Sequence, residues 1–236
     1  MKNEHFQPTI VYEDNHVLVV EKPPNMLTQG DSTGDWDLHS YLKQYLKEKY
    51  EKPGEAYVGM VHRMDRPVGG LLCFAKTSKA ASRLALQLKN QQFNRQYLAV
   101  VQGKIQQSGQ LEDYLLKDHR NNQVSVVDKD TPNSKKALLS FLPIESIENK
   151  TLVNIQLETG RSHQIRVQFS HFGHPLLGDV RYGKDKPGAQ IALWGTELSF
   201  YHPTKKEKLT FYSKPAGKSW LLLKNTLEDY FFSKGV

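Results

Sequence analysis

Residues 61–76 read V-H-R-M-D-R-P-V-G-G-L-L-C-F-A-K, and this stretch decides the predicted fold. Its first half is charged and ends in Pro67 and the pair Gly69-Gly70, which are turn-forming residues. Its second half, Leu71 to Ala75, is a short apolar run of strand length. The pattern predicts a turn that leads directly into a buried strand.

One carboxylate at this turn, Asp65, lies between Arg63 and Arg66, with His62 close by in the sequence. A carboxylate flanked by fixed positive charge stays ionised at neutral pH. An ionised carboxylate suits a catalytic nucleophile or base. Most Arg–Asp neighbours are instead surface ion pairs worth roughly 0–1 kcal/mol. The local pattern therefore leaves both interpretations open.

The motif H-R-M-D is also similar to the H-R-D catalytic loop of protein kinases. A kinase would require a Gly-rich phosphate loop, a V-A-I-K strand and a D-F-G triplet. The sequence contains none of these motifs, so the kinase interpretation fails.

Composition restricts the class of protein. The 236 residues are enough for a full core, and 38% hydrophobic with 24% charged residues is ordinary for a globular protein. No apolar run approaches the roughly 18 residues of a membrane span, and the first residues lack the apolar segment of a signal peptide. The single cysteine, Cys73, cannot form an internal disulfide, so we expect a reduced, cytoplasmic setting.

The net charge indicates a polyanionic partner. The chain has 32 Lys and Arg residues against 25 Asp and Glu residues, which leaves +7 at pH 7. An excess of this kind favours RNA or DNA through contacts with phosphate groups.

Periodicity predicts alternating strands and helices. Strands are expected at Ile10 to Tyr12 and at His16 to Lys22. Helical spacing predicts a first helix from Leu38 with Asp37 or Asp35 as N-cap, a second helix capped by Thr77 or Ser78, and a C-terminal helix over 219–232. The apolar faces expected for these helices are Leu38, Tyr41, Leu42, Tyr45 and Leu46; Ala81, Leu84, Ala85 and Leu88; and Leu223, Leu227 and Tyr230.

A second cluster of chemically active residues follows the strand Thr151 to Leu157. Ser162 is a plausible N-cap for a helix through Phe172, and Gly173 fits the left-handed position that ends it. His163 and Arg166 are three residues apart, so they share a face near the helix N-terminus, where basic groups and free N–H groups can bind an anion. Ile165 and Phe169, four residues apart, are expected to pack inward. Ordinary helix caps remain the alternative interpretation.

Nothing repeats at a fixed period, and no linker-like segment divides the chain. We therefore expect one sheet-rich domain over residues 1–236 with helices packed around the sheet.

Two separate stretches match the motifs of a known family. The first is His62-Arg63-Met64-Asp65 with Gly70-Leu71-Leu72; the second is T-G-R-S-H-Q-I-R, residues 159–166, with Gly173-His174-Pro175 and Gly178-Asp179. Between them lies Tyr97 in Q-Y-L-A-V-V-Q-G. In this order the motifs resemble the RluA-type pseudouridine synthases, which isomerise uridine to pseudouridine within RNA. The resemblance spans about residues 9 to 213.

The resemblance implies a role for each matching residue. Asp65 would be the nucleophile, Tyr97 would pack on the target base and assist proton removal, and Arg166 would pair with Asp65. Arg63 would fill the gap that the flipped nucleotide leaves in the RNA stack, and Ile165 would line the uracil pocket. The remaining residues expected to bind RNA are His62, Arg161 and His163.

The family's fold is α+β, a single catalytic domain whose mixed, mainly antiparallel sheet is flanked by helices. The resemblance implies no metal and no cofactor. The expected partner is ribosomal or transfer RNA, without DNA or membrane partners, and the expected state is a monomer. An enzyme that acts on a base must first take it out of the stack, at a cost of roughly a few kcal/mol.

The chain departs from the family pattern at a few positions. Val68-Gly69 stand where Thr-Ser is usual, Asn25 stands where glycine is common, and Leu193-Trp194-Gly195 replace Leu-His-Ala. We expect these changes to alter the RNA-binding surface. The chain also starts at the catalytic motifs, without the small N-terminal RNA-binding domain of many relatives, so target choice is expected to rest on the basic surface.

Two other functions would also use parts of these motifs. A non-catalytic RNA-binding protein on the same fold would not require a carboxylate among phosphates, which favours the enzyme. A glycosidase would normally need two placed acids, and Asp65 is the single convincing candidate; Asp179 is expected to shape its loop instead.

Overall fold

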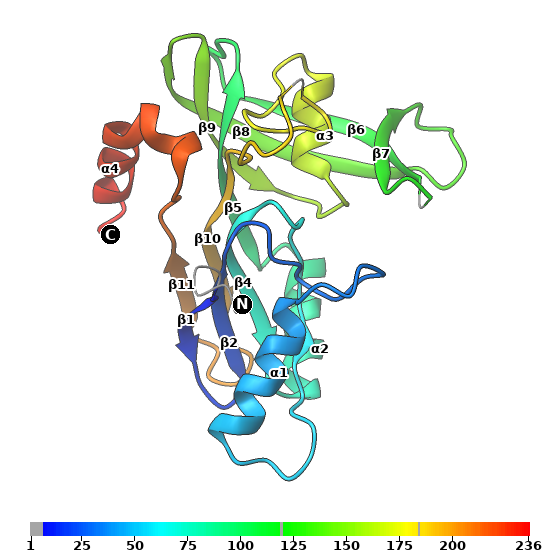
Figure 1. The fold of residues 1–236 in the computed structure, drawn as a ribbon, viewed down its shortest axis with the longest axis vertical. Coiled ribbons are helices and arrows are strands. Elements are labelled where there is room, and N and C mark those ends of the chain that lie inside the picture. The colour runs from blue at the N-terminus through cyan, green and yellow to red at the C-terminus, as the bar shows by residue number, and fades with distance from the viewer. Residues whose placement is uncertain (1–6, 119, 184) are drawn as a thin grey trace. The chain divides into compact units, whose positions relative to one another are not determined.

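The computed structural model describes residues 7–118, 120–183 and 185–236. Its internal contacts divide these residues into two compact units. Unit 1 contains residues 7–95 and 195–213, and unit 2 contains residues 96–194 and 214–236 with the gaps just given (Figure 1). The single catalytic domain over residues 1–236 stays a prediction.

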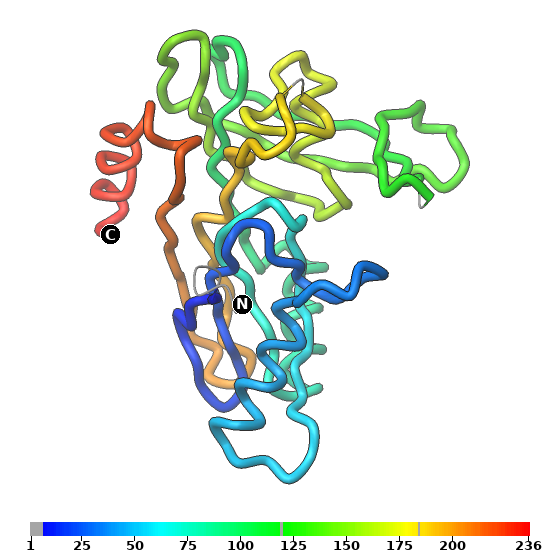
Figure 2. Tube along the Cα trace, in the orientation of Figure 1, coloured from blue at the N-terminus to red at the C-terminus, as the bar shows by residue number. Residues whose placement is uncertain are grey.

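Unit 1 is built on strands that run in the order β1-β2-β4-β10. The pairings β1–β2, β2–β4, β3–β4 and β10–β11 are antiparallel. The N-terminal hairpin and the late β10–β11 hairpin belong to the same unit. Their different colours in Figure 2 show that they come from distant parts of the sequence. The strands are β1 (Thr9–Glu13), β2 (Val17–Lys22), β3 (Gly59–Met60), β4 (Gly69–Ala75), β10 (Leu193–Tyr201) and β11 (Lys208–Tyr212).

The core of unit 1 lies between its strands and helix α2 (Ser78–Lys89). Val19 of β2 and Cys73 of β4 pair across the strands and pack with Leu84 of α2. All seven residues of β4 are buried, so both faces of this strand are covered, as the continuous apolar run predicts. Helix α1 (Leu38–Lys49) begins at Asp37, whose side chain accepts a hydrogen bond from the Ser40 N–H. This confirms the predicted N-cap.

Unit 2 contains a meander of antiparallel strands in the order β5-β9-β8-β6-β7. Together with the pairings of unit 1, these strands confirm the α+β class with mainly antiparallel strands. The strands are β5 (Asn94–Gln102), β6 (Gly109–Asp118), β7 (Gln123–Val127), β8 (Lys135–Ile147) and β9 (Lys150–Leu157).

Helices α3 (Gln164–His171) and α4 (Lys224–Ser233) contact opposite faces of these strands. Phe141 of β8 faces Phe169 of α3, with ring centroids 5.5 Å apart. Asn154 of β9 donates a hydrogen bond to the Tyr230 hydroxyl of α4 at 3.1 Å. Ile155, the β9 neighbour of Asn154, pairs with Phe141 across the strands. Because successive residues of a strand point to opposite faces, α3 and α4 lie on different sides (Figure 1).

Three details of the predicted helices are wrong. Helix α3 starts two residues after Ser162, and its N-cap is His163 in a left-handed conformation without a side-chain cap. Ala85 of α2 is exposed, and Ala80 is buried in its place. The C-terminal helix begins as a 3-10 helix, η2 (Lys218–Leu223), before α4. None of the helices in the described ranges is long and apolar enough to span a bilayer.

Candidate active site

Asp65 lies on a turn of unit 1 that is fixed by hydrogen bonds from its neighbours. The Val68 N–H donates to the Asp65 carbonyl oxygen at 3.1 Å, which closes the turn before β4. The Thr28 hydroxyl donates to the Met64 carbonyl at 2.8 Å and accepts from the Met64 N–H at 3.2 Å. Met64 is buried, Asp65 is half-buried and Arg63 is exposed. The turn therefore presents Asp65 and Arg63 on a rigid support, as a catalytic group requires.

A fully buried lysine, Lys22, contacts the backbone of the same turn. Its Nζ lies 2.8 Å from the Met26 carbonyl, 2.9 Å from the Pro23 carbonyl and 3.1 Å from the Arg66 carbonyl. Burial lowers the pKa of Lys22 to about 7, an effect that the Asp65 carboxylate opposes and the Arg66 charge increases. Three carbonyl acceptors match the three N–H donors of a protonated amine. Lys22 thus places an amine that titrates near neutral pH in the electrostatic environment of Asp65, a feature that the sequence did not predict.

Arg66, which follows Asp65 in the sequence, contacts the loop before α1. Its Nη1 lies 2.6 Å from the Asp35 carboxylate, and its Nε donates to the Asn25 carbonyl at 3.2 Å. The guanidinium group therefore ties the turn to the loop before α1.

His62 lies inside unit 1. Its Nε2 accepts a hydrogen bond from the Cys73 N–H at 3.2 Å, and its ring packs edge-on against Phe93. Burial, together with the charge of Arg95, lowers the pKa of His62 to about 3. The imidazole is therefore neutral at physiological pH, and it attaches the start of the Asp65 segment to β4.

The buried imidazole predicts a pH-dependent stability. Between pH 7 and pH 5 we expect the free energy of unfolding to fall by about 2 kcal/mol more in the wild type than in His62→Gln. In the unfolded chain the pKa of a histidine returns to about 6.5, whereas the native pKa of His62 is about 3. The unfolded state binds more protons in this window, so the contribution of His62 is complete above about pH 6.5 and is lost as the pH falls toward 3.

Urea titrations of both proteins at pH 5, 6 and 7 measure this difference. The glutamine side chain of the His62→Gln variant retains an acceptor for the Cys73 N–H but does not titrate. Equal losses in the two proteins would show that His62 is not a buried neutral group.

Tyr97 of β5 and Ile165 of α3 lie on the same side of the strands of unit 2. Tyr97 is buried on β5 and pairs with Ile155 of β9, which in turn pairs with Phe141 of β8. Directly paired residues of antiparallel strands project to the same face, and Phe141 contacts α3. Tyr97 is therefore on the α3 side of the strands, and Ile165 is a buried residue of α3 itself.

The loop before α3 is ordered by its own hydrogen bonds. The Gln164 side-chain oxygen accepts from the Thr159 hydroxyl at 2.8 Å and from the Arg161 N–H at 3.0 Å. Arg161 is exposed, and its Nε donates to the Lys136 carbonyl. His163 has φ 53° and ψ 17°, a left-handed conformation that is uncommon for a residue with a side chain. Such strain is found where a functional site fixes the backbone.

Arg166 forms a buried ion pair with Asp179. Its Nε lies 2.8 Å from Oδ2 and its Nη2 lies 2.8 Å from Oδ1. Burial raises the pKa of Asp179, but the bonds from Arg166 and from the Tyr182 and Arg181 N–H groups lower it by more, so the net pKa is lowered. Asp179 therefore shapes its loop, as expected, and it also forms a bidentate ion pair with Arg166. The predicted pairing of Arg166 with Asp65 stays a prediction.

The structure thus brings the predicted residues together in two groups. Unit 1 holds His62, Arg63 and Asp65 on one segment. Unit 2 holds the other group, which comprises Tyr97, Arg161, His163, Ile165 and Arg166. Among the residues that the structure describes, no cluster of His, Cys, Asp or Glu is arranged to hold a metal ion.

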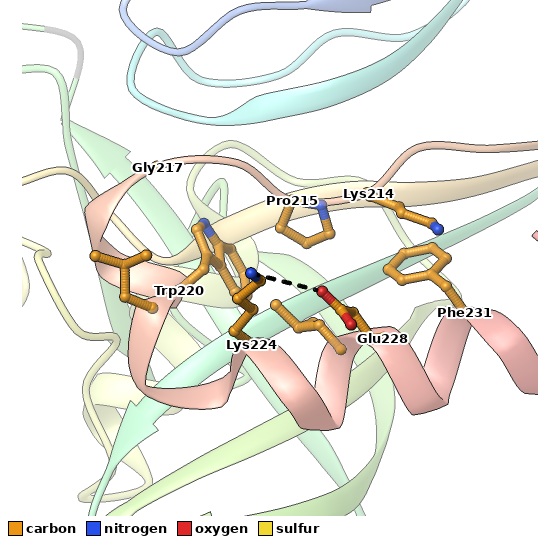
Figure 3. Close-up of a pocket in the computed structure, with 9 residues that line it drawn as sticks. Lys214, Pro215, Gly217, Trp220, Lys224, Glu228 and Phe231 are labelled. Atoms are coloured by element: carbon orange, nitrogen blue, oxygen red, sulfur yellow. Dashed lines mark ion pairs between the residues drawn. The ribbon is translucent and has the colours of Figure 1, made fainter.

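A pocket of about 250 Å³ lies elsewhere in unit 2, along η2 and α4 (Figure 3). Its walls are apolar with lysines at the edge, and Lys224 lies 3.9 Å from Glu228. None of the residues to which the family resemblance gives a role in catalysis or RNA binding lines it. The lining residues are Lys214, Pro215, Gly217, Trp220, Leu221, Lys224, Leu227, Glu228 and Phe231.

Comparisons with known sequences relate both groups of residues to one family. The family described as RNA pseudouridylate synthase matches residues 16–171. A Zymomonas mobilis protein named ribosomal large subunit pseudouridine synthase D is 33% identical, over 91% of this chain and 71% of the relative. A Bacillus subtilis protein named an uncharacterized RNA pseudouridine synthase is 38% identical, over 86% of this chain and 67% of the relative.

Solved structures share the fold. Human RNA pseudouridylate synthase domain containing 4 aligns with a TM-score of 0.73 at 18% identity and covers 88% of each chain. Human RNA pseudouridylate synthase domain containing 1 aligns with a TM-score of 0.67 at 22% identity and covers 97% of each chain.

Proposed function

The chain belongs to the RNA pseudouridylate synthase family and is an isomerase that acts on RNA, and from this premise we propose that it modifies uridine in large-subunit ribosomal RNA with Asp65 as the nucleophile. The name of the Zymomonas mobilis relative supports the choice of RNA. The net charge of +7 supports binding to a polyanion.

The observation that carries the proposal is the construction of the Asp65 turn. The half-buried carboxylate stands on a segment whose neighbours, His62 and Met64, are buried and hydrogen-bonded. The buried amine of Lys22 interacts electrostatically with it. A carboxylate attacks an electrophile in its charged form. A purely structural ion pair on the surface would not need this support.

In the proposed reaction, the N1–C1′ bond of the target uridine breaks and a C5–C1′ bond forms. C5 loses its proton and N1 gains one, so the composition of the RNA is unchanged and no oxidant is required. Asp65 supplies the nucleophilic carboxylate, and Arg166 is assigned as its positively charged partner. Tyr97 is assigned to the face of the base and to removal of the C5 proton.

The target uridine is proposed to flip out of the RNA stack before the reaction. Arg63 is exposed two residues before Asp65, and its planar guanidinium can stack in the gap that the base leaves. Arg161 and His163 are assigned to contacts with the RNA backbone. His62 is assigned a positioning role for the Asp65 segment in place of the predicted RNA contact, since its ring is buried against Phe93.

The experiment that tests this function measures tritium released from RNA made with [5-³H]uridine. Formation of the C5–C1′ bond expels the hydrogen at C5, so each conversion releases one tritium. We expect release from large-subunit ribosomal RNA by the wild-type protein and none from transfer RNA. Release from transfer RNA alone would overturn the choice of substrate. RNA binding without release from any RNA would identify a non-catalytic binding protein.

A further inference from the structure

Arg166 is held on one side by a carboxylate whose own orientation is fixed. The two hydrogen bonds from Arg166 to Asp179, both 2.8 Å, form a bidentate pair that sets the plane of the guanidinium. Asp179 Oδ1 also accepts from the Arg181 N–H at 3.0 Å and the Tyr182 N–H at 3.1 Å. The Asp179 side chain is fully buried. Its backbone contacts therefore leave the carboxylate one orientation.

The ring of Tyr182 supports the same guanidinium from another direction. The Arg166 Cζ lies 5.1 Å from the ring centroid, within the range of a cation–π contact. The Tyr182 hydroxyl lies 2.6 Å from His163 Nδ1 and accepts from the Val124 N–H at 3.0 Å. The Tyr182 carbonyl accepts from the Ser170 hydroxyl at 2.6 Å. His163 and Ser170 are at the two ends of α3, so the ring is attached to the helix that carries Arg166.

We propose that Asp179 and Tyr182 are positioning residues, which hold the Arg166 guanidinium in one orientation so that it can act on the Asp65 carboxylate. This inference rests on the proposed function, in which Arg166 is the charged partner of Asp65. A long arginine side chain samples many rotamers, and ordering it before the reaction lowers the cost of reaching the reactive geometry. Asp179 sets the plane of the group, and Tyr182 limits its movement out of that plane.

The competing explanation is that the Asp179–Arg166 pair only stabilises the loop after α3. A structural pair would lower activity only in proportion to the folded protein that is lost, so kcat per folded molecule would keep its wild-type value. A positioning pair acts through Arg166 alone. Its effect on kcat therefore disappears when the side chain at position 166 can no longer form the bidentate pair. Residues that act through one another show this non-additive behaviour in double-mutant cycles.

The test is a double-mutant cycle in the tritium-release assay, with the Asp179→Asn and Arg166→Lys substitutions alone and together. Lysine keeps the charge at position 166 but cannot form the bidentate pair. For Asp179→Asn alone we expect kcat to fall about 100-fold with KM nearly unchanged, because a small displacement of a catalytic group has this cost. In the Arg166→Lys background the same change is expected to alter kcat less than about twofold.

Two further variants decide the question if Asp179→Asn does not fold. Tyr182→Phe keeps the ring under the guanidinium and Tyr182→Leu removes it, so we expect Tyr182→Phe to keep most of the kcat that Tyr182→Leu loses. Asp113→Asn is the matched control, because Asp113 accepts its hydrogen bond from Gln168, another residue of α3. Its kcat is expected to equal that of the wild type.

The outcomes separate this inference from the proposed function. A wild-type protein that releases no tritium from any RNA would overturn both. An active wild type would overturn the inference alone if Asp179→Asn lost the same factor in both backgrounds, or if Tyr182→Phe and Tyr182→Leu were equally active.

Discussion

Asp65→Asn is expected to lower the rate of pseudouridine formation by about 10⁴-fold or more, as loss of a nucleophile does in other enzymes. Asparagine has nearly the same shape as aspartate but carries no charge and is a poor nucleophile. The side chain is half-buried on a turn that is closed by backbone and Thr28 hydrogen bonds. These bonds do not involve the carboxylate, so the turn is expected to keep its conformation. Single-turnover tritium release with excess enzyme measures the rate.

The same variant should leave binding and folding nearly intact. We expect the Kd for RNA to change less than about threefold, since phosphate contacts dominate affinity. The free energy of unfolding is expected to change by less than about 1 kcal/mol, as for other side chains outside the core. If the variant lost RNA affinity or melted early in proportion to its lost activity, Asp65 would be a structural residue.

Gly70→Ala is expected to destabilise the protein by about 4 kcal/mol or more, or to prevent folding. Gly70 lies at the start of β4, next to the Asp65 turn, and has φ +119°, which residues with a side chain rarely adopt. A Cβ atom at this position would lie 2.3 Å from the Gly195 carbonyl oxygen and 2.4 Å from its nitrogen. Because these contacts are backbone atoms in a sheet, they cannot move aside without breaking the strand. Thermal unfolding followed by circular dichroism measures the loss.

Two other glycines separate the clash from the backbone strain. Gly173 has φ +88° and Gly54 has no positive φ, and a Cβ at either position would meet nothing within 4 Å. Gly173→Ala is expected to cost about 1 kcal/mol from strain alone. Gly54→Ala is expected to be neutral or to stabilise by about 0.5 kcal/mol. Equal effects of the three substitutions would contradict the close approach of Gly70 and Gly195.

Elements whose signals are local could be predicted from the sequence. Helix α1 starts at its predicted cap, Asp37, because a side-chain carboxylate satisfies a free N–H of the first turn. The apolar run of β4 is buried on both faces, as a strand inside a layered domain must be. Ile165 and Phe169 of α3 are buried, as their helical spacing predicts.

Features that depend on distant contacts could not be predicted. By its position Lys22 is the polar end of a strand, and lysine is almost never fully buried. Nothing in the neighbouring sequence therefore predicts that its amine is buried against the Asp65 turn. Arg66 contacts Asp35, which lies on a loop whose path the sequence does not specify. The start of α3 was misplaced because Ser162 is a good N-cap by type, whereas the contacts of His163 with Tyr182 determine the backbone there.

In the candidate site, too, residues in local motifs could be predicted and contacts between distant residues could not. The motifs propose Asp65, Tyr97 and Arg166 as candidates by residue type and order, and the structure adds the contacts of the residues around them. Gln164 orders the loop before α3 through a hydrogen bond. Asp179 forms an ion pair with Arg166, and the Tyr182 ring contacts the same guanidinium. A buried carboxylate in a short loop between glycine and tyrosine carries no periodic pattern, so its second role was not predicted.

Mapping of pseudouridine in total RNA tests the central claim most directly. The RNA would come from a strain that lacks this gene and carries either the wild-type gene or Asp65→Asn. We predict at least one site in large-subunit ribosomal RNA that is absent in the deletion strain, returns with the wild type and stays absent with Asp65→Asn. A map that is unchanged by the deletion, or a site that Asp65→Asn restores equally well, would contradict the account.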